Sequence, residues 1–276
     1  MSLIKLIALD LDGTLLNSEK ELSPANEKAL RDCIAKGIYI VPATGRTVDG
    51  IPNMILDIPG VRYAITANGA MVEDLFQKKV IDHRLLTCQQ ALEILHYAES
   101  CKAMYDPYIE RRGISEARFM DHLDDYGLSP QIQQLVRRTR DTVPNIIEHV
   151  KTQNKPVEKI NLFFGDEGER QRVRKELEKR NDIVVSSSLY NNLEINAVGA
   201  TKGDGILRLA SYLNLKPEET MAFGDGGNDY SMIQKAGIGV AMGNGEPGLK
   251  EIADYVTLTN DEDGVAAAIE KLVLQQ

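Results

Sequence analysis

The chain has 276 residues, 43% of them hydrophobic and 26% charged, and its formal net charge is -9. These values are typical of a globular protein with one large or two ordinary domains, and they exclude a mostly disordered chain. The negative charge argues against broad affinity for nucleic acid or anionic membranes, so a small ligand or a metal ion is the expected partner. Composition leaves the oligomeric state open.

Three scattered cysteines, Cys33, Cys88 and Cys101, show no metal-binding spacing. Such cysteines indicate a reducing compartment, and we expect free and mostly buried thiols. The first apolar run contains Lys5 and is interrupted by Asp10, so it is too short for a signal peptide or a membrane span. We therefore expect a cytoplasmic protein with no membrane partner.

An apolar, branched stretch at residues 4–9 predicts a strand that is buried on both faces of a parallel sheet, and residues 10–14 (Asp-Leu-Asp-Gly-Thr) follow it. In an extended chain the carboxylates of Asp10 and Asp12 would point to the same side. Ligands of open α/β sheets bind at the carboxyl ends of strands, so this pair is a candidate cation site. The alternatives are a solvated turn and a calcium loop with Glu21 at its twelfth position, although apolar residues interrupt that oxygen pattern.

The next elements repeat the pattern of a strand followed by polar residues. Ser23 and Pro24 begin a predicted helix that ends at Gly37. The predicted strand at residues 38–43 then leads into Thr44, Gly45 and Arg46. Thr44 could bind phosphate beside the first loop, or it could be an ordinary helix N-cap.

A third predicted strand, residues 63–67, leads into Asn68 and Gly69. Asn-Gly is typical of a tight turn, here into a hairpin at residues 71–83, and turn formation alone would account for Asn68. A helix with a capping box follows at residues 87–97. The polar region beyond it contains arginines that we interpret as solvated helix faces, which together could attract an anionic substrate: Arg111, Arg112, Arg137, Arg138 and Arg140.

Regular alternation of strands and helices resumes in the second half of the chain. Strands are predicted at residues 159–164, 183–187, 193–198, 220–223, 237–241 and 255–258, and helices at residues 167–180, 201–213, 229–235, after Pro247, and at 263–274. Such alternation implies parallel pairing with helices on both faces. The predicted fold class is α/β, with a doubly wound, mostly parallel, Rossmann-like sheet.

Two further polar clusters follow predicted strands. Lys202 begins a helix although the helix dipole disfavours a cation there, so we expect an anion close by. The segment 224–229 (Gly-Asp-Gly-Gly-Asn-Asp) contributes Asp225, Asn228 and Asp229.

Together these residues have the composition of a phosphoryl-transfer site. A transferring phosphoryl group spreads negative charge over its oxygens, so it needs cationic and hydrogen-bonding clamps and a metal ion that neutralises the carboxylates. Magnesium is the expected ion because it binds few carboxylates and also substrate phosphate. One aspartate can then attack phosphorus while a second acid protonates the leaving oxygen and later activates water.

Four segments jointly resemble the signature motifs of the haloacid-dehalogenase superfamily: residues 10–15 (Asp-Leu-Asp-Gly-Thr-Leu), 44–46 (Thr-Gly-Arg), 202–203 (Lys-Gly) and 224–232 (Gly-Asp-x-x-Asn-Asp-x-x-Met). The long insertion between the second and third segments, with Asn-Gly-Ala at 68–70 and Ala-Met-Gly-Asn at 241–244, is similar to the Cof-type, type IIB sugar phosphatases. The resemblance implies a core domain at residues 1–84 and 194–276. It also implies an inserted α/β cap domain at residues 85–193 that selects the substrate, with Arg111 and Arg112 among the candidate contacts.

The resemblance further implies a role for each candidate residue. Asp10 would be the nucleophile and a magnesium ligand, and Asp12 would be the general acid and base, with its backbone carbonyl on the metal. Lys202 would bind phosphate and orient Asp10. The other implied roles are phosphate binding by Thr44, Gly45 and Asn228, metal binding by Asp225 and Asp229, and a substrate entrance formed by Arg46, Asn68 and Gly69.

The implied function is a magnesium-dependent phosphatase that hydrolyses small phosphorylated metabolites, such as sugar phosphates, through an aspartyl-phosphate on Asp10. Two alternatives stay open: a phosphomutase with the same chemistry, and a non-catalytic phosphoacceptor or binding protein. Asp204 departs from the family pattern and would add a charge near the phosphate. The Gly-x-Gly-x-x-Gly match at residues 243–248 lies far from the first strand, so we do not interpret it as a dinucleotide site.

Overall fold

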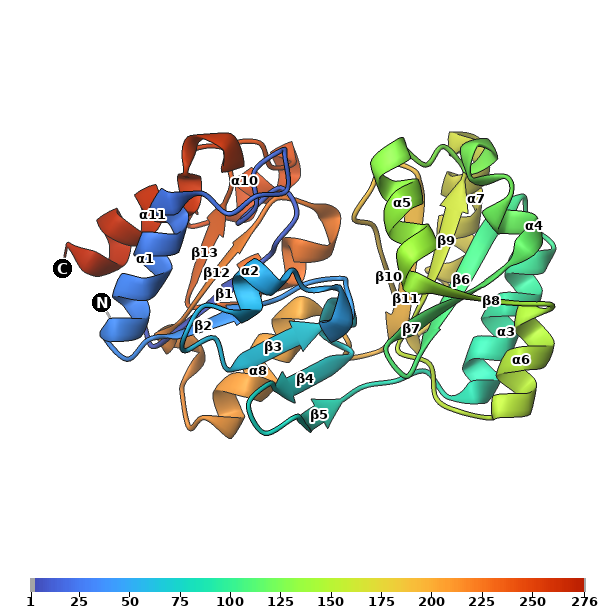
Figure 1. The fold of residues 1–276 in the computed structure, drawn as a ribbon, viewed down its shortest axis with the longest axis horizontal. Coiled ribbons are helices and arrows are strands. Elements are labelled where there is room, and N and C mark those ends of the chain that lie inside the picture. The colour runs from blue at the N-terminus through green and yellow to red at the C-terminus, as the bar shows by residue number, and fades with distance from the viewer. Residues whose placement is uncertain (1–2, 276) are drawn as a thin grey trace. The chain divides into compact units, whose positions relative to one another are not determined.

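A computed structural model describes residues 3–275 of the chain (Figure 1). The chain divides into two compact units, one formed by Met1–His83 with Thr201–Gln276 and the other by Arg84–Ala200. The expected roles of these units as core and cap stay a prediction.

The first unit contains a five-stranded, all-parallel sheet with the strand order β14-β13-β12-β1-β2. The strands are β1 (Leu6–Leu9), β2 (Tyr39–Pro42), β12 (Thr220–Gly224), β13 (Ile238–Ala241) and β14 (Tyr255–Val256). The helices of this unit are α1 (Pro24–Ala35), α2 (Asn53–Leu56), α8 (Lys202–Tyr212), α9 (Tyr230–Lys235), α10 (Pro247–Ile252) and α11 (Gly264–Ile269), which continues as a π-helix over Glu270–Leu274.

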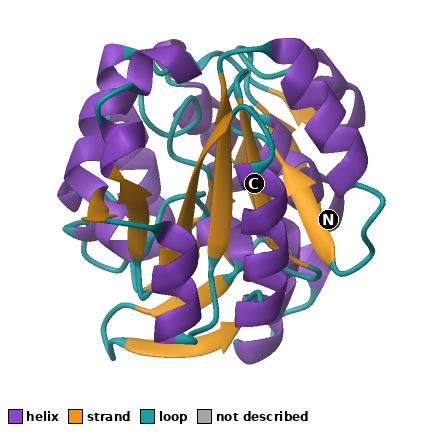
Figure 2. Ribbon diagram, turned by 90° about the vertical axis from the view of Figure 1, so that its right-hand side faces the viewer, coloured by secondary structure: helices purple, strands orange, loops and turns teal. Residues whose placement is uncertain are grey.

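Alternate residues of the parallel strands face two separate apolar cores. Ile7 and Leu9 of β1 pack with residues of α1 and α11, whereas Leu6 and Ala8 pack with residues of α8 and α9. All four are fully buried, as expected for a strand that is covered on both faces. Figure 2 shows helices around the strands, and the predicted doubly wound parallel sheet is confirmed.

The strand order reverses next to β1, and this reversal locates the site. The chain runs from β1 to β2 on one side of the sheet and later returns to β12 on the other side of β1. Ligands of doubly wound sheets bind in the crevice at such a reversal, outside the carboxyl ends of the strands. Residues after Leu9 and Gly224 are therefore brought together although they lie far apart in the sequence.

A small antiparallel sheet completes the first unit, in the order β3 (Tyr63–Thr66), β4 (Met71–Asp74) and β5 (Lys79–His83). The expected hairpin is present as β4 and β5. The turn before it, Ala67–Gly69, is left-handed throughout, with φ angles of 48°, 60° and 94°. A Cβ at Gly69 would lie 2.1 Å from the backbone oxygen of Thr201, so this close approach to the start of α8 requires glycine.

The second unit contains a six-stranded mixed sheet with the order β10-β11-β9-β6-β7-β8. Its strands are β6 (Ala103–Ile109), β7 (Arg112–Glu116), β8 (Arg140–Val143), β9 (Lys159–Phe164), β10 (Ile183–Ser186) and β11 (Asn192–Ala197). Its helices are α3 (Cys88–Glu99), α4 (Ala117–Met120), α5 (Pro130–Thr139), α6 (Ile146–Gln153) and α7 (Glu167–Leu177). Residues of α3, α6 and α7 share one apolar core with β6, β9 and β11.

Several sequence predictions need correction. Of the arginines interpreted as solvated helix faces, Arg137 and Arg138 lie on α5, but Arg112 and Arg140 lie on β7 and β8, and the side chain of Arg140 is only 6% exposed. The last parallel strand is shorter than expected and ends at Val256. The three cysteines are free as expected, but only Cys33 is buried, because Cys88 and Cys101 are partly exposed. No helix within residues 3–275 is long and apolar enough to cross a membrane.

Candidate active site

The carboxylate of Asp10 directly follows β1 and is buried beside the ammonium group of Lys202. Nζ of Lys202 donates to Oδ1 of Asp10 at 2.7 Å and to Oδ1 of Asp229 at 2.6 Å. Lys202 is the first residue of α8 and is fully buried. The two carboxylates are the anions expected near a lysine that begins a helix, where the dipole alone would disfavour it.

Asp225 completes a cluster of three carboxylates with Asp10 and Asp229. Each offers one oxygen, and these oxygens lie within 4.8 Å of one another. Asp229 is held in place because its Oδ2 accepts hydrogen bonds from the backbone N–H groups of Asp225 and Gly226, both at 2.9 Å. Hard divalent cations such as Mg²⁺ prefer carboxylate oxygens, so the donor set fits such an ion.

Thr14 and Gly13 shape this cluster from the loop after β1. The hydroxyl of Thr14 donates to Oδ1 of Asp225 at 2.7 Å. Gly13 has a φ of 83°, and a Cβ there would lie 2.4 Å from Oδ2 of Asp225, so glycine permits the close approach. Thr14 was not among the predicted site residues, although it belongs to the first motif, residues 10–15, and could have been included for that reason.

The cluster holds more negative than positive charge. Burial raises the pKa of Asp10 well above its usual value, and Asp229 and Asp225 raise it further against the opposing effect of Lys202. Burial and the neighbouring Asp229 raise the pKa of Asp225 to about 6. Burial alone would lower the pKa of Lys202, but Asp10 and Asp229 outweigh that effect and raise it. A divalent cation would relieve the repulsion between the acids.

The carboxylate of Asp12 has different partners from that of Asp10. Nε and Nη2 of Arg46 donate to its two oxygens at 2.9 and 2.8 Å, and Lys20 forms a further ion pair with it at 2.9 Å. Burial alone would raise the pKa of Asp12, but Arg46 and Lys20 outweigh this and lower it. The Asp12 side chain is 37% exposed, so it is accessible to solvent. Two acids two residues apart thus have separate environments.

The two alternatives for the first loop are wrong. Asp10 is only 8% exposed, which contradicts a solvated turn. Glu21, the twelfth residue of a calcium loop, is exposed, and its backbone N–H donates to Oδ1 of Asn17 at 2.8 Å. Among residues 3–275, Glu21 is not part of the carboxylate cluster.

Thr44 is buried at the end of β2, and its hydroxyl caps a turn, not a helix. Its Oγ1 accepts a hydrogen bond from the backbone N–H of Arg46 at 3.2 Å. The following 3-10 helix, Val48–Gly50, has Thr47 as its N-cap residue. The helix-cap alternative for Thr44 is therefore wrong.

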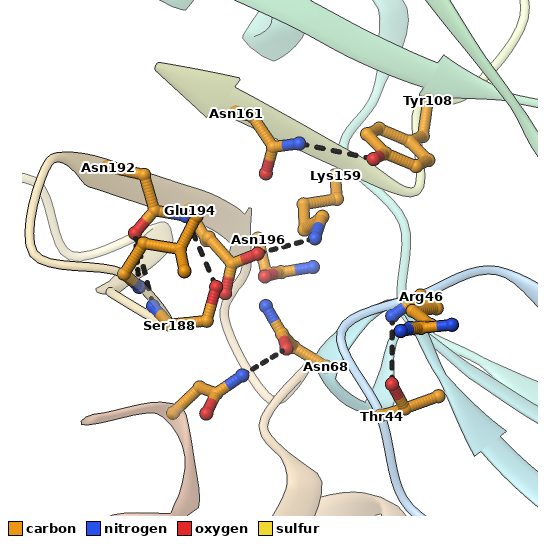
Figure 3. A network of polar contacts seen from close by, with 12 residues as sticks. Thr44, Arg46, Asn68, Tyr108, Lys159, Asn161, Ser188, Asn192, Glu194 and Asn196 are labelled. Atoms are coloured by element: carbon orange, nitrogen blue, oxygen red, sulfur yellow. Dashed lines mark hydrogen bonds and ion pairs between the residues drawn. The ribbon is translucent and has the colours of Figure 1, made fainter. Parts of the chain in front are cut away.

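Asn68 joins the loop after β2 to the loop after β12. Nδ2 of Asn228 donates to Oδ1 of Asn68 at 3.1 Å (Figure 3). The backbone N–H groups of Asn68 and Ala67 donate to the carbonyl oxygens of Thr44 and Arg46 at 3.0 and 2.8 Å. Asn68 thus does more than form a turn, since it ties together two of the predicted site segments.

The carboxylate of Asp204, in the first turn of α8, has a hydroxyl partner and a basic partner in the same unit. Its Oδ2 accepts from the hydroxyl of Thr201 at 2.6 Å, and its Oδ1 pairs with Lys235 at 2.5 Å. Asp204 was expected to add a charge near the phosphate, and the structure shows that Lys235 balances this charge.

Comparison with known proteins identifies the family. Residues 7–269 match the haloacid dehalogenase-like hydrolases. Phosphatase YwpJ of Bacillus subtilis is 34% identical over 288 residues, covering 98% of this chain and 100% of that protein. The 5-amino-6-(5-phospho-D-ribitylamino)uracil phosphatase YcsE of the same organism is 34% identical over 271 residues, covering 98% and 96%. A solved structure of a HAD subclass IIB sugar phosphatase matches with a TM-score of 0.81 at 28% identity, covering 97% of this chain and 98% of that chain.

These matches confirm the fold class and the enzyme class expected from the sequence, since the relatives are hydrolases named as phosphatases. The family is the one that the four sequence motifs indicated. These motifs follow β1, β2 and β12 and begin α8. The chain therefore belongs to the haloacid dehalogenase-like hydrolases and, within them, to the Cof-type family.

Proposed function

We propose that this protein is a Mg²⁺-dependent phosphatase that hydrolyses small phosphorylated metabolites, such as sugar phosphates, through an aspartyl-phosphate on Asp10. The observation that carries the proposal is the meeting of Asp10, Asp225 and Asp229 around the buried Lys202. Two relatives support the substrate class, because one is named a uracil-derivative phosphatase and the other a sugar phosphatase.

The first chemical step forms a bond between a carboxylate oxygen of Asp10 and phosphorus and breaks the bond from phosphorus to the alcohol oxygen. Asp12 gives that oxygen a proton. In the second step Asp12 takes a proton from water, whose oxygen bonds to phosphorus, and Asp10 is released with inorganic phosphate. The first step needs the protonated form of Asp12 and the second needs the ionised form. Arg46 and Lys20 lower the pKa of Asp12, so they favour the ionised form and make a proton on Asp12 easier to give away.

The surrounding residues hold the phosphoryl group and the metal. Asp10, Asp225 and the backbone carbonyl of Asp12 would bind Mg²⁺, and Asp229 would support the ion from beside it. The ion would neutralise the carboxylates that face the anionic substrate. Lys202 orients Asp10, and its ammonium group adds a positive charge that would stabilise the phosphoryl group. The remaining proposed contacts are Thr44, Gly45 and Asn228 at the phosphate and Arg46, Asn68 and Gly69 at the entrance, with the second unit as the cap that selects the substrate.

Phosphate release from p-nitrophenyl phosphate in the presence of Mg²⁺ tests the proposal. Asp10→Asn should lower kcat by at least about 10⁴-fold, because it removes the nucleophile. The matched control is Asp261→Asn, an exposed acid that accepts hydrogen bonds from Ser18 and should leave kcat within about twofold. An Asp10→Asn protein with unchanged activity would remove Asp10 from the mechanism.

A further inference from the structure

The loop between β13 and α10 contains three of the four residues of the Ala-Met-Gly-Asn motif at 241–244 (Figure 1). Among residues 3–275, the carboxylate cluster takes none of its three acids from this loop. The loop nevertheless contacts both segments that carry the cluster in the first unit, the one after β1 and the one after β12. We call residues 242–246 the bridging loop.

The backbone of the bridging loop is bound to the segment after β12. The N–H of Met242 donates to the carbonyl oxygen of Gly224 at 3.0 Å, and the N–H of Glu246 donates to that of Asp225 at 2.9 Å. Gly245 lies against the same acid, since a Cβ on it would be 3.3 Å from Cα of Asp225. The bridging loop therefore packs along the backbone of a proposed metal ligand.

The side chain of Asn244 connects the bridging loop to the segment after β1. Its Nδ2 donates to the carbonyl oxygen of Gly13 at 2.8 Å. Its Oδ1 accepts from the backbone N–H of Asn260 at 2.9 Å. One amide group thus connects a backbone donor to the carbonyl oxygen of the glycine in the first motif.

Two buried asparagines hold the rest of the same segment. Nδ2 of Asn260 donates to the carbonyl oxygen of Leu16 at 3.0 Å, and Nδ2 of Asn26, on α1, donates to that of Leu15 at 3.3 Å. Asn26 and Asn260 are 1% and 7% exposed, whereas Asn244 is exposed. Asn244 is therefore the member of this set that can be replaced without opening the interior of the protein.

Gly13 needs this support because glycine is both required and flexible at its position. Its φ is 83°, and a Cβ would lie 2.4 Å from Oδ2 of Asp225. Glycine has more backbone freedom than any other residue, so the segment could adopt other conformations. Its neighbours are Asp12, the proposed general acid and base, and Thr14, whose hydroxyl donates to Asp225 at 2.7 Å. A fixed carbonyl group at Gly13 restricts both neighbours.

The exposed position of Asn244 makes stability a weak explanation for its two hydrogen bonds. Such bonds replace bonds to water, so each contributes only modestly to the free energy of folding. Displacement of a catalytic group has a much larger effect on the reaction, since a shift of about 1 Å can lower a rate about 100-fold. The effect of Asn244 on the site should therefore exceed its effect on the fold.

We propose that Asn244 is a positioning residue, which fixes the carbonyl group of Gly13 and thereby holds Asp12 and Thr14 in the arrangement that binds the metal ion and moves the proton. Asn244 acts through the backbone, because Asp12 is a proposed metal contact through its carbonyl and Thr14 is bonded to the ligand Asp225. The inference rests on the proposed function and deepens it, because it adds a residue from outside the carboxylate cluster to the same site.

Calorimetric titration of the substrate-free protein with Mg²⁺ is the first measurement, because it does not depend on turnover. Asn244→Ala should weaken Mg²⁺ binding about tenfold, the effect of one lost hydrogen bond. With p-nitrophenyl phosphate and saturating Mg²⁺, kcat should fall about tenfold because Asp12 is displaced. KM should change less than about twofold, since the proposed phosphate contacts Thr44 and Lys202 lie on other segments.

Asn145→Ala is the matched control. Asn145 is also exposed, and its Oδ1 accepts from the backbone N–H of Glu148 at 2.8 Å in the second unit. Each substitution should lower the melting temperature of the metal-free protein by no more than about 4 °C. Only Asn244→Ala should change Mg²⁺ binding and kcat. If alanine impairs folding, Asn244→Ser should show the same selective loss, because its hydroxyl is too short to span both partners.

The outcomes separate the two proposals. Wild-type Mg²⁺ affinity and kcat in Asn244→Ala would overturn the positioning role while the proposed function stands. Weaker Mg²⁺ binding by Asn244→Ala, beside a wild-type protein that binds Mg²⁺ but releases no phosphate, would support the positioning role and refute the proposed function. A wild-type protein that neither binds Mg²⁺ nor releases phosphate would refute both.

Discussion

Each of the two units buries a group of charged side chains, but they balance the charge differently. In the first unit, Lys202 pairs with both Asp10 and Asp229, and Asp225 is the third acid of the same carboxylate cluster. On the sheet of the second unit, Lys159 of β9 pairs with Glu194 of β11, and Arg140 of β8 pairs with Asp106 of β6. The comparison teaches that a surplus of acid calls for a cation from outside the chain, whereas an acid that is matched by a basic side chain does not.

Removal of the metal ion should have the largest effect, and only the acid-rich cluster of the first unit should respond to it. A chelator should lower phosphate release by roughly 10³-fold or more, because the metal contributes several kcal/mol of charge stabilisation in the transition state. Added Mg²⁺ should raise the melting temperature of the wild-type protein, and Asp225→Asn should reduce that rise. A melting temperature that is independent of Mg²⁺ in both proteins would argue against a metal at the cluster.

Removing the lysine from each group should show which acids a metal ion can rescue. Lys202→Met and Lys159→Met should each lower the free energy of unfolding by about 3–5 kcal/mol in metal-free buffer, because each removes the ammonium group that pairs with a buried carboxylate. Mg²⁺ should restore part of the loss in Lys202→Met alone. Denaturant unfolding with and without Mg²⁺ measures this, and equal rescue of both variants would contradict the comparison.

Arg46→Lys should have a smaller effect, confined to the reaction. Lysine keeps the charge beside Asp12 but loses the two parallel hydrogen bonds of the guanidinium group, so kcat should fall about tenfold. The control is Arg31→Lys, in which an exposed arginine pairs with Glu27 on α1. A kcat equal to that of the wild type would show that the paired hydrogen bonds do not position Asp12.

The smallest effect is expected when both members of a matched pair are replaced. Lys159→Met with Glu194→Met should leave the free energy of unfolding unchanged or slightly higher, since the desolvation cost disappears together with the attraction. Thermal unfolding of the double variant beside Lys159→Met alone measures it. Equal destabilisation of the two would mean that the pair supports the fold.

Much of the parallel sheet of the first unit was predictable because its signals are local. A short branched run before Asp10 and a short apolar run before Asp225 are enough to mark buried strands that end in acids. The second unit was harder, because Asp106 and Pro107 interrupt the apolar pattern of β6. Their burial depends on pairing with β9, which lies about fifty residues later in the chain, so no local pattern reveals it.

The sequence by itself determined which residue types stand at the ends of the parallel strands, because hydrophobic runs and turn residues act over a few positions. Tertiary structure decided their partners: Lys202 bridges Asp10, 192 positions away, and Asp229, while Arg46 pairs with Asp12. It also decided that Arg140 crosses Gly113 to reach Asp106. The physical reason is that strand order and register, which set these contacts, follow from long-range packing and not from spacing along the chain.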